Sequence, residues 1–210
     1  MITPACQTHA ERIARLRQLK RVLLLPYLLV AAASALGAAA APPDTGPARQ
    51  AAVRHDAQHD FDFAFGSWRT HIRRLLHPLT GGSEWVEYDG THTVRPLWGG
   101  RANIGELEAD GPAGHFEAMS ARLYNPETGR WHVSYGNPRD GSISHPVVGG
   151  FVDGRGEFYG ETTVNGKTVR VRELYIPVDA RTRRFEIAFS VDDGRSWETN
   201  WVMTDTLLQR

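Results

Sequence analysis

Four polar residues interrupt stretches that are otherwise apolar or aromatic: Arg122, Arg172, Glu186 and Asn200. If these side chains point into the protein they must be paired, because burying a lone charge is very costly. An arginine–glutamate pair inside a barrel would either brace the structure, which is the simpler expectation, or orient the polar group of a ligand. The direction of the side chains stays open at this point, since both faces of the surrounding segments carry aromatic residues.

The same residues are also compatible with catalysis. Glu186 is suited to act as a general acid or base, and Arg122 or Arg172 would stabilise negative charge on a substrate. The sequence has no Gly-x-Ser-x-Gly segment, and its single cysteine, Cys6, lies near the N-terminus, so it provides no recognisable nucleophile. A cavity-based enzyme of undefined reaction is therefore the alternative to a binding protein. A purely structural or partner-binding role is a further alternative.

Aromatic residues are the remaining candidates for a binding site. Pockets for small molecules are mostly apolar and hold only a few polar groups. The wall candidates are Trp68, Trp85, Tyr124, Tyr135 and Trp201. Our main hypothesis is that the protein binds a small hydrophobic ligand against these side chains.

The sequence indicates neither a metal site nor a cofactor. His77-Pro78 and His145-Pro146 each precede x-x-Gly-Gly, but no His-x-His or HExxH segment accompanies them. Zinc normally requires three or four ligands of defined geometry. Other histidines on expected strands are predicted to lie on the surface or to be hydrogen-bonded; they include His71, His92 and His132.

Turn signals divide the chain after residue 61 into short segments. Asp or Asn before Gly tolerates the positive φ that tight hairpin turns need. Such pairs occur at Asp89-Gly90, Asp110-Gly111, Asp140-Gly141, Asp153-Gly154, Asn165-Gly166 and Asp193-Gly194, and further turns at 125–129 and 178–181. The segment 190–197 resembles a single sialidase Asp-box. One copy cannot build a propeller, so we interpret it as a structural hairpin.

Between the turns, apolar residues alternate with polar ones as they do in β-strands. Phe185, Ile187 and Phe189 share one face, and Trp131, Val133 and Tyr135 share another. No segment in this region shows a sustained helical period. We expect nine to eleven antiparallel strands in an all-β, up-and-down barrel, because closure removes exposed sheet edges. A two-sheet sandwich is the alternative, but the short regular loops argue against its crossovers.

The N-terminus has the three-part pattern of a secretory signal peptide. Five basic residues precede Val22, and a run of small and apolar residues extends from there to Ala41. We predict cleavage near Ala40, a signal peptide over 1–41, and a periplasmic or secreted protein. An uncleaved membrane anchor is the alternative, although Pro26 and the many alanines weaken it. After cleavage no stable membrane anchor is expected.

The remainder of the chain divides into a linker and one domain. Residues 42–58 are rich in Pro, Ala and Gly, and 59–208 are predicted to form the barrel. Of the 24 basic and 24 acidic residues of the whole chain, five basic residues and one acidic residue precede Val22, which leaves a net charge of −4 after cleavage. This balance does not indicate binding to nucleic acid.

Several landmarks resemble a known family. The segment 61–68, with Gly66-Ser67-Trp68, is similar to the first strand of lipocalin-like (calycin-type) barrels, and 122–126, 146–149 and 189–201 are similar to other landmarks of an uncharacterised bacterial family of single-domain barrels. The resemblance implies the barrel fold, with Trp68 at its closed end, and no settled activity. Nitrobindin-like barrels are more distantly similar. Their C-terminal haem-ligating His has no counterpart here, because no His follows His145.

Overall fold

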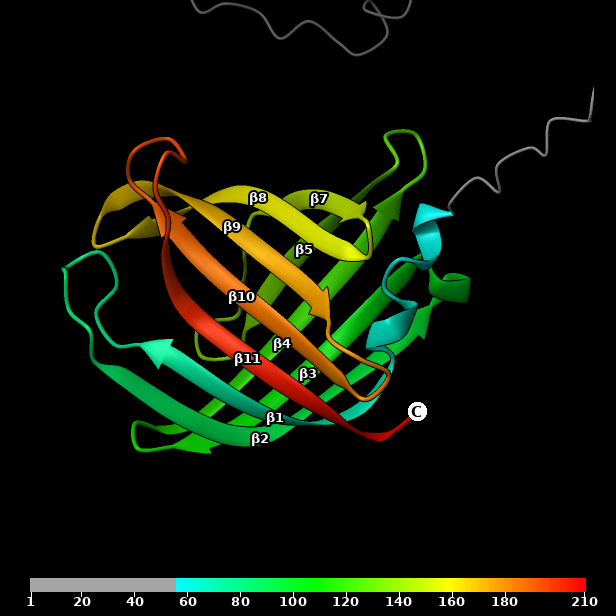
Figure 1. Ribbon diagram of the computed structural model, residues 1–210, viewed down its shortest axis with the longest axis horizontal. Helices are drawn as coiled ribbons and strands as arrows, with labels where there is room; N and C mark the ends of the chain where they lie inside the picture. The colour runs from blue at the N-terminus through cyan, green and yellow to red at the C-terminus, as the bar shows by residue number, and fades with distance from the viewer. Residues whose placement is uncertain (1–55) are drawn as a thin grey trace, which may run out of the picture. The chain divides into compact units, whose positions relative to one another are not determined.

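The computed structural model describes residues 56–210, which form eleven β-strands and three short 3-10 turns (Figure 1). The predicted signal peptide and residues 42–55 of the predicted linker lie outside the described residues. The turns are η1 (Ala57–His59), η2 (Asp62–Ala64) and η3 (Trp98–Gly100). The strands are β1 (Gly66–Leu75), β2 (Trp85–Leu97), β3 (Ala102–Gly111), β4 (Gly114–Asn125), β5 (Arg130–Asn137), β6 (Ser142–Ile143), β7 (Val147–Val152), β8 (Arg155–Val164), β9 (Lys167–Pro177), β10 (Thr182–Ser190) and β11 (Glu198–Gln209).

Ten of these strands form a closed antiparallel ring in chain order. β1 pairs with β11, β4 pairs with β5, and the short β6 adds only to β5. Each consecutive pair is joined by a hairpin or a short loop, so the predicted up-and-down barrel is confirmed. Closure leaves each main strand with a neighbour on both sides over most of its length, which is how barrels avoid exposed edges.

The predicted turns are found with two exceptions. Asp110-Gly111 was predicted to be a turn, and this is wrong: both residues belong to β3, and the chain turns at 112–113. Asp153-Gly154, Asn165-Gly166 and Asp193-Gly194 all have positive φ at both residues and connect consecutive strands. Asp89-Gly90 was predicted to be a turn, and this is wrong: both residues lie in the middle of β2. Gly90 is needed there because a Cβ would lie 1.9 Å from the carbonyl oxygen of Glu108 on β3. The glycine therefore permits a close approach of two strands rather than a turn.

The hairpin between β10 and β11 contains the Asp-box-like segment, and the interpretation of a structural hairpin is confirmed. Ser196 donates its hydroxyl to Asp192 Oδ2 at 2.6 Å, and Ser190 donates to Oδ1 of the same carboxylate at 2.8 Å. The Gly194 amide donates to Ser190 Oγ at 2.8 Å. These bonds hold the pKa of Asp192 well below its usual range, mainly through Ser196.

One end of the barrel is closed by the segment that precedes β1. Phe61 is fully buried, and its ring packs edge-on against Trp131, Phe151 and Tyr175 at centroid distances of 4.9, 5.0 and 5.1 Å. Trp131 also donates its indole hydrogen to the carbonyl of Ala57 at 2.8 Å. Residues 57–58, which were expected in the linker, therefore take part in closing the barrel.

The opposite end is less complete. β4 pairs with β5 only from Met119 onward, and β7 pairs with β8 only up to Tyr159, so residues 114–118 and 160–164 lack those neighbours. The loop that follows β5 lies between these edges in the ring order.

None of the helices in residues 56–210 has the length and hydrophobicity that a membrane span requires.

Candidate functional site

A cavity of about 920 Å³ occupies the interior toward the less complete end. Its apolar wall comes mainly from alternate residues of β4, β10 and β11, whose inward positions follow from the two-residue period of a strand. These side chains are Phe116, Phe185, Ile187, Phe189, Trp201 and Met203. The rim carries polar residues of the loop after β5 and of β8. The cavity therefore combines an apolar body with a polar mouth.

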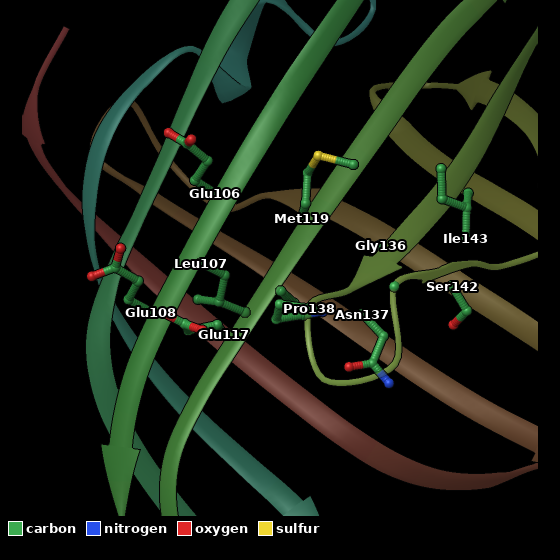
Figure 2. Close-up of a pocket in the computed structure, with 12 residues that line it drawn as sticks. Glu106, Leu107, Glu108, Glu117, Met119, Gly136, Asn137, Pro138, Ser142 and Ile143 are labelled. Carbon is green, nitrogen blue, oxygen red and sulfur yellow. The ribbon is translucent and has the colours of Figure 1, made fainter.

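A smaller pocket of about 430 Å³ adjoins the mouth on the side of β3 and β4. Figure 2 shows residues that line it, with Met119 on β4, Pro138 on the loop after β5 and Ser142 on β6. Met119 and Ile143 line both spaces. We regard the smaller pocket as a side branch of the same mouth.

The first polar group in the interior is Glu173 on β9, which is 2% exposed. Its Oε2 accepts hydrogen bonds from the hydroxyls of Tyr135 (2.6 Å) and Tyr175 (3.1 Å), and the two hydroxyls lie 2.9 Å apart. Burial raises the pKa of Glu173 to about 7, because the two tyrosine hydrogen bonds and the charge of Arg122 only partly offset the loss of water. Burial likewise raises the pKa of Tyr135 well above its ordinary value, so its hydroxyl stays protonated and donates.

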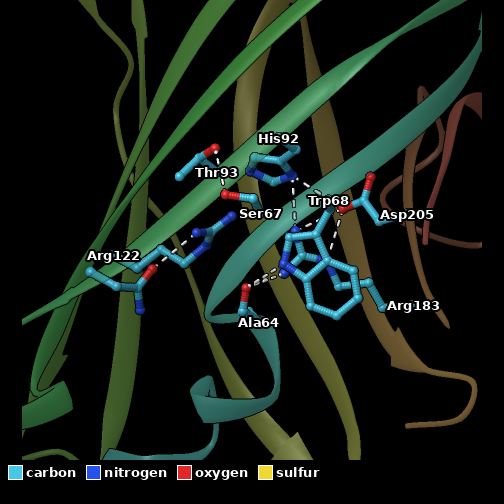
Figure 3. A network of polar contacts seen from close by, with 9 residues as sticks. Ala64, Ser67, Trp68, His92, Thr93, Arg122, Arg183 and Asp205 are labelled. Carbon is cyan, nitrogen blue, oxygen red and sulfur yellow. Dashed lines mark hydrogen bonds and ion pairs between the residues drawn. The ribbon is translucent and has the colours of Figure 1, made fainter. Parts of the chain in front are cut away.

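The second polar group links β2, β10 and β11 to the closed end (Figure 3). Arg183 Nε donates to Asp205 Oδ2 at 2.8 Å, and Nη2 forms an ion pair with the same oxygen at 2.7 Å. Its Nη1 donates to the carbonyl of Ala64 at 2.5 Å. The same carbonyl accepts the indole hydrogen of Trp68 at 2.9 Å. His92 Nδ1 lies 3.1 Å from Asp205 Oδ2 and 3.0 Å from Arg183 Nη2. This network is almost completely buried.

The protonation of this network follows from burial and pairing. Burial lowers the pKa of His92 below its ordinary value, so the imidazole is neutral at pH 7. Burial alone would raise the pKa of Asp205, but the hydrogen bond with His92 and the charge of Arg183 hold it below its ordinary value. Burial lowers the pKa of Arg183 to about 10, so it stays charged. Arg183 and Asp205 thus form a neutralised pair.

Three of the predicted site residues line the cavity: Arg122, Tyr135 and Trp201. Arg122 is 4% exposed, and its guanidinium lies over the rings of Phe61 and Tyr175 at 5.2 and 5.6 Å. It therefore sits where the packed closed end meets the cavity.

Three other predicted residues do not line the cavity. Glu186 lies on the outer face of β10 and pairs with Arg184 at 2.5 Å, because Phe185 and Ile187 take the inward positions on either side of it. Arg172 lies on the outer face of β9, where its guanidinium stacks over Trp197 at 4.8 Å. Asn200 is buried at a bulge of β11, where the register passes from Thr199 to Trp201. The geometry thus offers no Glu186-based chemistry in the cavity.

The remaining predicted residues belong to the framework. Trp68 is 2% exposed and lies at the closed end, with the guanidinium of Arg183 4.1 Å from its ring centre. Tyr124 packs against Trp131 near the same end, at 5.5 Å between ring centres. Trp85 begins β2 near the open end and lies under the guanidinium of Arg73 at 5.1 Å.

Sequence reasoning missed the interior residues, which are Glu173, Ser120, Arg183 and Asp205. It expected His92 to lie on the surface or to be hydrogen-bonded, and the structure shows it buried and hydrogen-bonded. A usable signal was present. Each stands two residues from an apolar residue that faces inward, as Glu173 does between Val171 and Tyr175. A charged residue in phase with an apolar face is expected to be buried. Within residues 56–210, no group of three or more metal-ligating side chains is close enough to hold a metal ion.

No family model and no curated protein matches this sequence. Among solved structures, the chain is similar to the S-type phycobiliprotein lyase CPES from Guillardia theta, with 12% sequence identity and a TM-score of 0.51 over 73% of this chain and 93% of that chain. At this identity the likeness concerns the fold. Together with the strand order, it shows that residues 66–209 form a lipocalin-like β-barrel.

Proposed function

We propose that this protein binds one small, largely apolar molecule inside the barrel and that it does so after export from the cytoplasm. The observation that carries the proposal is the cavity of about 920 Å³ with aromatic and aliphatic walls and a polar mouth. Sites for small molecules commonly have volumes of roughly 300–1,000 Å³ and a few convergent polar groups. The similarity to the phycobiliprotein lyase supports the barrel fold. The class of ligand proposed here is inferred from the cavity alone.

The binding test uses N-phenyl-1-naphthylamine, a neutral fluorophore that brightens in apolar sites. We expect saturable binding by the wild type, quenching of Trp201 fluorescence, and a higher melting temperature through mass action. Native mass spectrometry of protein from its own host would weigh a ligand that is already bound.

Two variants of β4 make this test specific. Ala118 lines the cavity, whereas Ala121 lies on the outer face of the same strand. Ala118→Trp should fill the mouth and abolish fluorophore binding, and Ala121→Trp should leave it intact. Equal binding by both variants would show that the dye occupies the surface and would contradict the proposal.

A further inference from the structure

Three polar atoms converge on the inner face of Gly105 in β3. A Cβ at this glycine would lie 2.5 Å from Ser120 Oγ, 2.9 Å from His92 Nε2 and 3.3 Å from Arg122 Nη1. All four residues line the large cavity. Because any side chain at position 105 would push these groups apart, the glycine is what allows a hydroxyl, an imidazole and a guanidinium to meet at one point.

These groups are buried, and their hydrogen bonding is incomplete. Ser120 is 6% exposed and Arg122 is 4% exposed, yet Ser120 Oγ and Arg122 Nε have no hydrogen-bond partner within the described part of the chain. Arg122 donates from Nη1 to Asn103 Oδ1 at 2.9 Å and also interacts with the Tyr175 hydroxyl, but its Nε–H is left without a partner. Buried donors without partners are costly, so a ligand that accepts from them would be bound preferentially.

The charge balance identifies the kind of acceptor. Asp205 is committed to Arg183, and among residues 56–210 no carboxylate lies within ion-pair distance of Arg122. The interior carboxyl group that feels the charge of Arg122 is Glu173, whose pKa of about 7 leaves it largely protonated below neutral pH. The cavity therefore contains one cation in excess, and a single negative charge would neutralise it.

We propose that the ligand of this barrel carries a carboxylate group and that Arg122, Ser120 and His92 bind this group beside Gly105. The proposal rests on the binding function proposed above and names its ligand class. A carboxylate carries the single charge that the cavity lacks, and its two oxygens match the fork of a guanidinium. In the free protein the imidazole proton lies on Nδ1 and bonds Asp205; the bound carboxylate favours the other tautomer, in which Nε2 donates to it and Nδ1 accepts from Arg183 Nη2.

The test compares two ligands that differ only in the head group. Dodecanoic acid and 1-dodecanol are used at pH 6 to displace N-phenyl-1-naphthylamine from the full barrel. We expect dodecanoate to displace the dye at a concentration at least about tenfold lower than 1-dodecanol requires, as charge-assisted hydrogen bonds imply. Equal potency of the acid and the alcohol would overturn the carboxylate proposal while leaving the cavity function standing. Failure of the wild type to bind the dye, the acid and the alcohol would overturn both proposals.

Variants assign the preference to this subsite. Arg122→Met and Gly105→Ala should each reduce the advantage of the acid to about threefold or less, with little change for the alcohol. Arg139→Met is the matched control, because Arg139 lies at the exposed rim of the same cavity and bonds the carbonyl of His115 at 2.9 Å. A loss of preference in Arg139→Met equal to that in Arg122→Met would overturn the assignment.

Ser120→Ala keeps the test decisive if Arg122→Met does not fold. It removes an unpaired hydroxyl, and we expect it to retain the fold and weaken the acid several-fold relative to the alcohol. An unchanged acid-to-alcohol ratio in a folded Ser120→Ala protein would exclude Ser120 from the subsite and contradict the proposed contact set.

Discussion

Glu173 is the residue whose state depends most directly on pH near neutrality. Its carboxyl group faces Tyr135 from β5, Tyr175 from its own strand and the charge of Arg122 from β4. The two hydroxyls stabilise the carboxylate, but burial favours the neutral acid and outweighs them. The interior therefore holds a proton that an exposed glutamate would have lost.

Replacing Glu173 by glutamine should remove one pH-dependent term from the stability. The pKa is about 7 in the folded protein against an ordinary value of 4.5. As pH rises between these values, the unfolded chain loses the proton while the native protein keeps it. The free energy of unfolding should therefore fall by about 3 kcal/mol and then level off above pH 7. Urea denaturation across this range should show the loss in the wild type relative to Glu173→Gln.

The difference between the two proteins isolates this effect from His92. The lowered pKa of His92 produces the opposite slope, since its contribution to stability is lost as pH falls. It is present in both proteins and cancels. A difference that does not change with pH would mean that Glu173 ionises normally.

Part of this site could be predicted from single residues, and part could not. Arg122 was recognised as a polar group within an apolar setting and Tyr135 as an aromatic wall candidate, and both line the cavity. Glu186 was selected for its chemistry, although the phase of Phe185 and Ile187 already places it on the other face. The pairing of Arg183 with Asp205 joins neighbouring strands through a register that no local pattern specifies.

At the scale of strands, two adjacent glycines of β7 have different roles. A Cβ at Gly149 would lie 2.0 Å from the carbonyl oxygen of Glu157, whereas a Cβ at Gly150 would meet nothing within 4 Å. Gly149→Ala should therefore destabilise the barrel by more than ~2 kcal/mol, because backbone must move apart. Gly150→Ala should change stability by less than ~1 kcal/mol, since it mainly restricts the unfolded chain. Thermal denaturation of both variants measures the contrast, and equal effects would contradict it.

The closed end depends on the indole of Trp68. Removing it in Trp68→Ala deletes a 2% exposed side chain and its hydrogen bond to Ala64, so we expect a loss of about 3–5 kcal/mol. Trp98→Ala is the control, because Trp98 is 68% exposed, and it should cost no more than about 0.5 kcal/mol. Chemical denaturation distinguishes the two, and a loss below about 1 kcal/mol in Trp68→Ala would contradict a structural role.

The elements themselves were more predictable than the site. Alternation in β5 and β10 identified inward residues such as Trp131 and Phe189 because a strand has a fixed two-residue period. The turn predicted at Asp89-Gly90 failed for a different reason. A glycine in a turn and a glycine beneath a neighbouring strand look the same in sequence, and only the approach of β3 distinguishes them.

For the whole molecule, the sequence predicts a precursor and a shorter mature protein. The basic flank and the apolar run from Val22 to Ala41 should direct export, followed by cleavage near Ala40. N-terminal sequencing of the protein from its native cell fraction should give a start near Ala41. A start at Met1 or Ile2 would contradict cleavage, and recovery from the cytoplasm would contradict export.

The pairing of β1 with β11 has a consequence for folding. Ser67 lies opposite Gln209, so the ring closes only when the two ends of the domain meet. Pairing across nearly the whole domain carries a large loop-closure entropy and is typical of chains that fold in milliseconds to seconds. Until closure, β1 and β11 each present an open edge to other chains. In the closed ring, β1 and β11 form an antiparallel pair like the strand pairs that are joined by hairpins. A permuted chain that joins residues 210 and 56 through a flexible linker, so that the segment before β1 is kept, and that is cut at Asn165-Gly166 should therefore close into the same barrel.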